Sequence, residues 1–223
     1  MPEDRGYYYF NNGLSCLFEM PTGDARRLLP SHLQPLEVQH GRSILSVTAF
    51  DFYEGDGGAY EELALSILVP PLVKPGYLLP KAALYPFIVA TSTAHGRKEG
   101  IERWKLPHLM RDIDVEFTEG EDKIKVAVSA DGDPICEMTG TSHIFEPADL
   151  LFHSFVTDET GNYKSNLTMR GTGYSEHEFE RGSLTLHNHE MTAGLTIDEV
   201  ADYPFREQWM KGGVEVFTPL ENV

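Results

Sequence analysis

The chain has 223 residues, of which 41% are hydrophobic, so one sizeable core is within reach. The 35 acidic residues outnumber the 18 Lys and Arg and give a net charge of −17 at pH 7, which argues against nucleic acid and anionic membrane surfaces as partners. There is no run of eighteen apolar residues and no charged-then-apolar leader, and the two cysteines fit a reducing compartment, so we expect a cytoplasmic protein that neither spans a membrane nor is secreted. An anionic small substrate stays open, because one buried cation can dominate a pocket whatever the net charge.

The first third of the chain is predicted to form β-strands separated by turns. Residues 7–18 indicate two short strands around an Asn-Asn-Gly turn. Thr22 is placed to cap a short helix that ends at Pro30. Residues 43–53 and 60–69 are strands of good β-formers on either side of a Gly-rich turn.

The middle of the chain contains the most chemically dense segment. After a proline-rich irregular connection at residues 70–81, residues 85–94 are apolar and β-branched, as in a buried strand. Residues 100–108 then bring a Gly, an acid, two cations, a Trp and a Pro-His step into nine positions, which predicts a functional turn between two strands. Alternation over residues 113–117 and 123–129 predicts a hairpin with one face in water.

The last third continues the same pattern without a repeat or a domain boundary. Thr196 with Glu199 three residues later forms a capping-box pattern that predicts a short helix. The other predicted elements are a strand over residues 135–145, a hairpin of residues 150–156 and 166–170, two strands within residues 172–190, and a last strand at residues 213–217. The count is about ten or more strands with two or three short helices, which predicts a single, mainly β domain over residues 1–223, mostly antiparallel and closed or nearly closed.

Four segments, in this order and spacing, resemble the acetoacetate decarboxylase family and its wider superfamily. They are residues 25–30, the Gly-Ala-Tyr-Glu-Glu run at residues 58–62, the Gly-Ile-Glu-Arg-Trp-Lys-Leu-Pro run at residues 100–107, and residues 182–189. The resemblance implies a cone-like antiparallel β-barrel with an enclosed pocket, usually in a homo-oligomer.

The resemblance also implies Schiff-base decarboxylation, in which a lysine amine attacks a substrate ketone and a second lysine lowers the pKa of the first. In the family that lysine pair directly follows the proline that corresponds to Pro107. Here His108 and Leu109 follow Pro107, and an imidazole cannot form an iminium with a ketone. Asn11 and Asn12 stand where the family has the arginine for the substrate carboxylate, so they are candidate substrate-binding residues in its place.

Three candidate catalytic residues follow from this comparison. Glu62 matches a pocket acid of the family, and strand alternation places it on the face opposite Leu63 and Leu65. Enclosure in a pocket would raise its pKa, and an outward-facing, solvated glutamate is the alternative. His108 is a candidate general acid or base that Glu62 could orient, with a hydrogen-bonded turn histidine as the alternative. Lys105 is a candidate replacement nucleophile, with a solvated or ion-paired lysine as the alternative.

The remaining candidates are less specific. Glu102, Arg103 and Trp104 form either a wall of the pocket or a structural turn. The His187-x-His189 pair could place two imidazoles on one strand face, but the acids around it do not follow a metal-ligand spacing, so we predict no metal and no cofactor.

The sequence therefore predicts a small-molecule enzyme of the acetoacetate decarboxylase-like superfamily that lacks the Schiff-base lysine. Its substrate would be a keto or enol-type compound, such as a keto acid or a polyketide-like compound, and its reaction a lyase, dehydration or cyclisation step by acid–base chemistry. Two alternatives stay open, namely a non-catalytic ligand-binding barrel and a Schiff-base decarboxylase or aldolase that uses Lys105.

Overall fold

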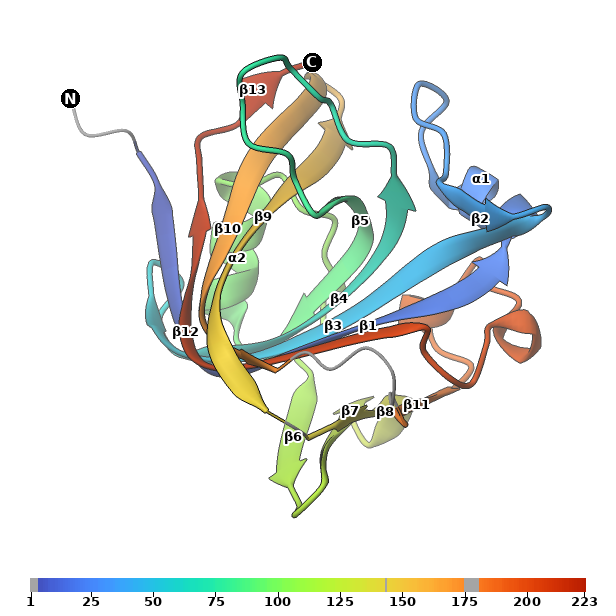
Figure 1. The fold of residues 1–223 in the computed structure, drawn as a ribbon, viewed down its shortest axis with the longest axis vertical. Helices are drawn as coiled ribbons and strands as arrows, with labels where there is room; N and C mark the ends of the chain where they lie inside the picture. Colours follow the sequence, from blue (N-terminus) through green and yellow to red (C-terminus); the bar gives the residue numbers. More distant parts are fainter. Residues whose placement is uncertain (1–3, 143, 175–180) are drawn as a thin grey trace.

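A closed β-barrel forms the centre of this computed structural model, which describes residues 4–142, 144–174 and 181–223 (Figure 1). In order around the barrel, the strands are β1 (Gly6–Pro21), β12 (Arg206–Phe217), β10 (Gly161–Tyr174), β9 (Phe145–Asp158), β5 (Ala82–Thr91), β4 (Tyr60–Val69) and β3 (Arg42–Gly55). The barrel closes because β3 pairs with β4 on one side and with β1 on the other. Two short strands pair with barrel strands, β2 (Glu37–Gln39) with β3 and β13 (Glu221–Asn222) with β10. The predicted mainly β barrel is confirmed.

The barrel is mixed rather than purely antiparallel, which agrees with the mostly antiparallel domain predicted from the strand pattern and refines the antiparallel barrel that the resemblance implies. Neighbouring strands are antiparallel except β5 and β9, which pair in parallel from Ala82 opposite Phe152 to Leu84 opposite Ser154. Parallel strands require a long crossover connection, and residues 92–144 supply it. This crossover contains a helix and most of a second sheet.

The second sheet lies against the outside of the barrel, below it in Figure 1. Its order is β11-β8-β7-β6. The strands are β6 (Asp114–Glu119), β7 (Lys123–Ala130), β8 (Asp133–Thr141) and β11 (Ser183–Leu186). The predicted hairpin is the β6–β7 pair, and β7 alternates between buried and exposed residues as expected for a sheet with one wet face. Of the two strands predicted within residues 172–190, the part at residues 175–180 lies outside the described residues.

The first strand is continuous, so the predicted hairpin at the Asn-Asn-Gly sequence is wrong. β1 runs through this sequence and carries a bulge between Tyr9 and Asn12, where its pairing with β3 shifts register. Gly13 follows the bulge. A Cβ on this residue would lie only 2.6 Å from the ring of Phe50, so the close approach requires glycine. The Asn-Asn-Gly sequence, which is typical of a turn between two strands, here forms a bulge that changes the direction of the side chains along one strand.

The two α-helices are short and lie at the ends of the barrel. Helix α1 (Thr22–Leu28) begins at Thr22, with Pro21 rather than Thr22 in the capping position. Helix α2 (Ala94–Glu102) takes in the first three residues of the predicted turn at residues 100–108, and residues 103–108 form a non-helical connection. The Thr93 hydroxyl accepts a hydrogen bond of 3.1 Å from the amide of Gly96 at the start of α2. The Thr196 capping box is also wrong, because Ile197–Glu199 is a single 3-10 turn and Thr196 makes no side-chain cap.

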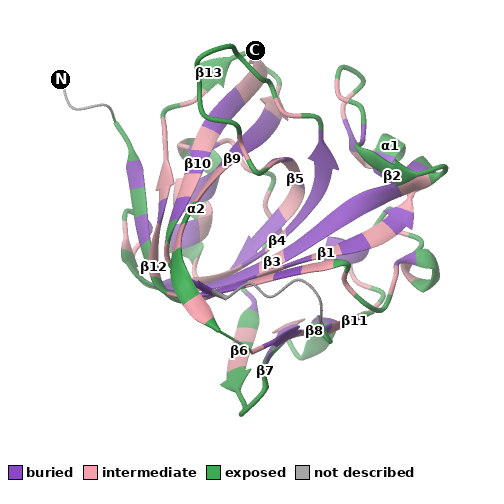
Figure 2. Ribbon diagram, viewed as in Figure 1, coloured by how far each residue is buried: buried purple, intermediate pink, exposed green. Residues whose placement is uncertain are grey.

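Two apolar clusters share the barrel wall. The outer faces of β1, β3 and β4 pack on the second sheet through residues such as Leu63 and Leu65, and β3 is mostly buried from Ser43 to Phe52 (Figure 2). The inner faces carry an aromatic cluster that includes Tyr8, Phe52 and Trp104. Within the described residues, no helix has the length and apolar character needed to cross a membrane.

Candidate functional site

The barrel encloses an inner cavity that adjoins a larger hollow. The inner cavity has a volume of about 60 Å³ and the larger hollow beside it of about 370 Å³. Four residues line both spaces: Ser15, Leu84, Phe152 and Gln208. An enclosed, mostly apolar cavity with a few polar groups is the usual form of a small-molecule site.

Glu62 lies at the inner end of this cavity. It is on β4 and faces inward with Ala64 and Ser66, whereas Leu63 and Leu65 face the second sheet, as the alternation predicts. Its side chain is half-buried, but the accessible part faces the cavity rather than bulk solvent. Burial raises the pKa of Glu62 to about 8.

Glu215 is a second carboxyl at the same place, and the sequence reasoning missed it. It is on β12, is only 4% exposed, and lines the same inner cavity as Glu62. Burial raises the pKa of Glu215 well above its usual range, and the negative charge of Glu62 raises it further. The signal was present as an acid between two valines, Val214 and Val216, in the last predicted strand.

Neither carboxyl has a hydrogen-bond or ion-pair partner among residues 4–142, 144–174 and 181–223. Burying an acid without a partner costs stability, and native proteins keep few such groups outside functional sites. The pair is therefore the strongest functional feature of the cavity.

An aromatic floor closes the cavity below the two carboxyls. Trp104 donates a hydrogen bond of 2.5 Å from Nε1 to the hydroxyl of Tyr8 and stacks on Phe217, with 4.9 Å between ring centres. Tyr60 lines the same space and is 7% exposed. Burial raises the pKa of both Tyr8 and Tyr60, so both phenols stay neutral hydrogen-bond donors. Trp104 therefore lines the small space next to Glu62 and Glu215.

The structure does not bring His108 to Glu62. The His108 ring packs on Gly100 of helix α2, where an added Cβ would lie 2.2 Å from Nε2, and it does not line the cavity. Both ring nitrogens are buried without a hydrogen bond in the described part of the chain. Burial, together with the charge of Arg97, lowers the pKa of His108 to about 4, so the imidazole is neutral at pH 7. The backbone around His108 is held to β5, where Val89 bonds to Pro107 and Leu109.

Lys105 is ion-paired away from the cavity. Its ammonium contacts Asp158, bonds the Thr160 hydroxyl at 3.0 Å and lies 4.6 Å from the centre of the Tyr163 ring. The hydrogen bond that Lys105 donates to Asp158 is the largest of the effects that raise the pKa of Lys105. A Schiff-base nucleophile needs the opposite shift.

We therefore expect no iminium at Lys105. Incubation with a ketone such as acetoacetate followed by borohydride should leave Lys105 unmodified, because its amine is protonated and paired with Asp158. Peptide mass spectrometry measures this directly. A reduced adduct on Lys105 would restore the decarboxylase or aldolase alternative.

The other predicted substrate-binding residues point away from the cavity. Glu102 is exposed and pairs at 4.0 Å with Lys98 on the outer side of α2. Arg103 bonds Asp56 at 2.6 Å and also pairs with Asp4 and Glu99. Asn11 bonds Asp51, and Asn12 accepts a hydrogen bond of 3.1 Å from Trp209 on the outer face. These contacts are structural, because each side chain is already engaged outside the barrel.

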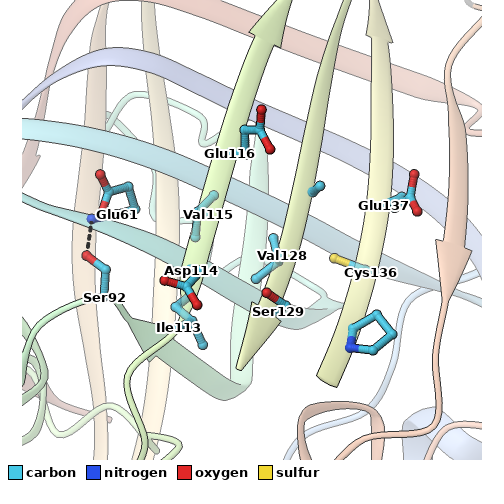
Figure 3. Close-up of a pocket in the computed structure, with 12 residues that line it drawn as sticks. Glu61, Ser92, Ile113, Asp114, Val115, Glu116, Val128, Ser129, Cys136 and Glu137 are labelled. Carbon is cyan, nitrogen blue, oxygen red and sulfur yellow. Dashed lines mark hydrogen bonds between the residues drawn. The ribbon is translucent and has the colours of Figure 1, made fainter. Parts of the chain in front are cut away.

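A second hollow of about 510 Å³ lies outside the barrel, between β4 and the second sheet (Figure 3). Several acids surround it, including Glu61, Asp114 and Glu137, and the amide of Glu61 donates to the Ser92 hydroxyl at 2.9 Å. The Cys136 thiol is inert, because burial raises its pKa to about 12. The described residues contain no group of three or more side chains able to hold a metal ion, around His187 and His189 or elsewhere.

Comparisons with known proteins agree with this architecture. No family model and no curated protein matches the sequence. The chain is similar to the solved structure of acetoacetate decarboxylase from Legionella pneumophila, with a TM-score of 0.66 and 14% identity, covering 98% of this chain and 87% of that chain. It is also similar to an acetoacetate decarboxylase-like enzyme from Sphingomonas wittichii RW1, with a TM-score of 0.60 and 12% identity over 98% and 92% of the two chains. The enduracididine biosynthesis enzyme MppR complexed with pyruvate gives a TM-score of 0.58 and 13% identity over 97% and 90%.

The protein thus has the fold of the acetoacetate decarboxylase-like superfamily, as the sequence resemblance predicted. At these identities the likeness concerns the fold. What the cavity does has to be argued from its own residues.

Proposed function

We propose that the protein is a small-molecule enzyme that acts on a keto or enol-type substrate by acid–base chemistry at Glu62 and Glu215. One observation carries the proposal: two buried carboxyls without partners face one enclosed cavity, and both have raised pKa values. Two acids whose pKa values differ within one site can act as base and acid at the same pH. Glu215 takes the place beside Glu62 that the sequence suggested for His108.

The chemistry starts with removal of a proton from the carbon next to the substrate carbonyl. The negative charge of Glu62 raises the pKa of Glu215, so we assign Glu62 as the carboxylate base that accepts this proton and Glu215 as the acid. Glu215 remains protonated and donates its proton to the carbonyl oxygen, which gives an enol and moves the charge from Glu62 to Glu215 without leaving a net oxyanion. Tyr60 is placed to donate a hydrogen bond to the same region. From the enol, a lyase, dehydration or cyclisation step follows according to the substrate.

The fold relatives are consistent with this substrate class. The MppR structure is a complex with pyruvate, which is a keto acid. We extend that class to this chain, with a ketone or enol at the inner end of the cavity.

Exchange of carbon-bound hydrogen for deuterium tests the proposal without knowledge of the natural substrate. In D2O, the wild-type protein should catalyse hydrogen–deuterium exchange at the carbon next to the carbonyl of an unbranched methyl ketone, and NMR follows this exchange. Glu62→Gln should reduce the exchange rate by about 100- to 10,000-fold. The rate should rise with pH as Glu62 loses its proton and level off above pH about 8. Glu61→Gln is the matched control, because Glu61 is the next residue on β4 and lines the outer hollow instead.

The binding-barrel alternative predicts a different result. If no ketone exchanges and Glu62→Gln binds ligands as the wild type does, the cavity is a binding site without acid–base chemistry. Equal exchange rates in wild type and Glu62→Gln would also remove Glu62 from the mechanism.

A further inference from the structure

A hollow of about 340 Å³ lies on the outside of the barrel, and we call it the β9–β10 hollow. Leu151 and His153 of β9 face it, whereas Phe152 between them lines the inner cavity, so the barrel wall separates the two spaces. The connection at residues 70–81 and strand β13 border the same hollow, and Figure 1 shows both beside the ends of β9 and β10. This is a second place where the protein could hold a small molecule, apart from the carboxyl pair.

Two polar side chains are buried in the wall of the β9–β10 hollow. Lys164 of β10 is 5% exposed, donates a hydrogen bond of 2.9 Å to the amide oxygen of Asn166 and lies 3.4 Å from the carboxylate of Glu221. His153 is 6% exposed, and burial together with the charge of Lys164 lowers its pKa, so the imidazole is neutral at pH 7. Burial of a cation costs free energy even when the cation is paired, so a buried lysine in an outer wall points to a function.

The contact between Lys164 and Glu221 leaves both groups able to bond a ligand. An ammonium has three N–H donors, and Lys164 uses one on Asn166 and at most a second on Glu221. An ionised carboxylate accepts at both oxygens, and only Oε2 of Glu221 contacts Lys164. The Glu221 side chain is also half-exposed. A ligand can therefore bond the ammonium and the carboxylate while the pair between them stays intact.

The β9–β10 hollow has charges of both signs. Lys74 on the connection also lines it, close enough that its charge contributes to the lowered pKa of His153. Glu221 supplies a negative charge opposite the two ammonium groups of Lys74 and Lys164. A ligand with a single charge meets a like charge here as well as an opposite one. A zwitterion meets an opposite charge at each of its two ends, so charge complementarity favours it.

The connection contributes apolar groups to the same hollow. Tyr77 and Leu78 are 75% and 83% exposed, and Leu72 is exposed as well, although all three are large hydrophobic residues that line the hollow. Figure 2 shows that this connection is exposed along most of its length. Exposed apolar side chains at the rim of a polar hollow gain free energy when an apolar group covers them. The volume is within the range of small-molecule sites.

We propose that the β9–β10 hollow binds a zwitterionic amino acid with a large apolar side chain. The ligand carboxylate pairs with Lys164 and Lys74, and the ligand ammonium pairs with Glu221. The ligand side chain packs on the apolar residues of the connection. This site does not depend on the proposed function, because the barrel wall lies between it and the carboxyl pair.

Calorimetric titration with three matched probes tests the site. L-phenylalanine, 3-phenylpropanoate and 2-phenylethylamine share a phenyl group on a two-carbon chain, and the last two lack the ammonium and the carboxylate respectively. L-phenylalanine should bind at least about tenfold more tightly than either fragment, because it makes one more charge-assisted contact. Equal affinities for L-phenylalanine and one fragment would remove the zwitterion from the proposal.

Two variants assign the charged ends. Lys164→Met should weaken the binding of L-phenylalanine and 3-phenylpropanoate about tenfold and should not weaken that of 2-phenylethylamine. Glu221→Gln should weaken L-phenylalanine and 2-phenylethylamine about tenfold and should not weaken 3-phenylpropanoate. Lys81→Met is the control and should change none of the three, because Lys81 follows the same connection but lines a different hollow.

Lys74 keeps the test decisive if Lys164→Met does not fold. Lys74 is exposed on the connection, so Lys74→Met should fold and weaken L-phenylalanine and 3-phenylpropanoate about threefold. Unchanged affinities in both Lys74→Met and Glu221→Gln would place any binding outside this hollow. An equal loss for all three probes in either variant would mean that the substitution disturbs the wall rather than an ionic contact, and would also overturn the proposal.

Discussion

Replacement of Glu62 by Gln is expected to stabilise the folded protein, and the gain should grow with pH. In the unfolded chain the carboxyl ionises near its usual pKa of 4.5, whereas in the folded protein burial raises that pKa to about 8. Between these values the folded state keeps a proton that the unfolded state has lost, so the wild type loses stability as the pH rises through this window. Gln is neutral at every pH and avoids the loss. The free energy of unfolding of Glu62→Gln should exceed that of the wild type by about 3 to 5 kcal/mol at pH 8.

Urea unfolding at pH 5 and pH 8 measures this difference. At pH 5 the two proteins should be nearly equal, because Glu62 is protonated in the folded wild type and only partly ionised in the unfolded chain. Glu61→Gln, on the same strand but outside the cavity, should show no such pH dependence. A Glu62→Gln variant that is less stable than the wild type at pH 8 would mean that the ionised carboxylate is favourably bound in the fold, and the acid–base pair would lose its basis.

Combined with the loss of exchange activity, this result would be diagnostic. A residue whose removal stabilises a protein and abolishes its chemistry is retained for function. Glu215→Gln should behave in the same direction, because burial and the charge of Glu62 both raise the pKa of Glu215. The two substitutions share one cavity, so their effects on stability should not add.

The sequence could predict the barrel and the strand face of Glu62 because both depend on local pattern, whereas the suggestion that this face lines a pocket came from the family resemblance. Alternation along residues 60–69 puts Glu62 and Leu63 on opposite faces, and this holds in the structure because β4 is regular over these residues. Glu215 follows the same rule on β12. It is hard to find from the sequence because an isolated acid in a terminal strand usually faces water.

The helix and the parallel pair could not be predicted, for physical reasons that differ. Helix α2 has two glycines, Gly96 and Gly100, and no apolar stripe, so neither propensity nor periodicity indicates it. Glycine is needed at both positions because the helix packs directly on Tyr60 and His108. A Cβ on Gly96 would lie 2.9 Å from the Tyr60 ring, and a Cβ on Gly100 would collide with the His108 ring. The parallel β5–β9 contact joins segments on either side of a long crossover, and strand patterns alone carry no information on that pairing.

The position of His108 shows why a motif can be matched while its chemistry is not. The Gly-x-Glu-x-x-x-x-Pro frame is present, but its last turn of helix places Gly100 under the imidazole and directs Lys105 toward Asp158. Lys105 also adopts a positive φ of 55°, which re-aims the chain before Leu106 enters the cavity wall. Spacing along the sequence could not indicate this change of direction.

Replacement of Trp104 by Ala should give the largest loss of stability of any single substitution in the floor. Trp104 is 4% exposed, stacks on Phe217 on one face and carries the Arg103 guanidinium 4.7 Å from its centre. Its Nε1 also bonds the Tyr8 hydroxyl. Removal of a buried aromatic ring leaves a cavity that the surrounding wall does not fill, so Trp104→Ala should cost about 3 to 5 kcal/mol in unfolding free energy.

Trp104→Phe separates the ring from its hydrogen bond. It keeps the stacking on Phe217 but leaves the Tyr8 hydroxyl without the donor at 2.5 Å, so it should cost about 1 to 2 kcal/mol. Urea unfolding measures both variants. Indole should raise the melting temperature of Trp104→Ala and not that of the wild type, because the vacated space matches the ring that was removed. Losses of the same size in both variants would mean that the hydrogen bond, rather than the ring, holds the floor together.

The same substitution tests whether the floor sets the acidity of the pair. Trp104 closes the cavity beneath Glu62 and Glu215, so its loss lets water reach both carboxyls. Hydration favours the ionised form, and the pKa of Glu62 should fall from about 8 toward its usual range. The rising limb of the exchange rate against pH should then move to lower pH in Trp104→Ala and return toward its wild-type position when indole is added. An unchanged pH profile in a folded Trp104→Ala protein would show that burial by the strands alone, without the floor, sets the acidity of Glu62.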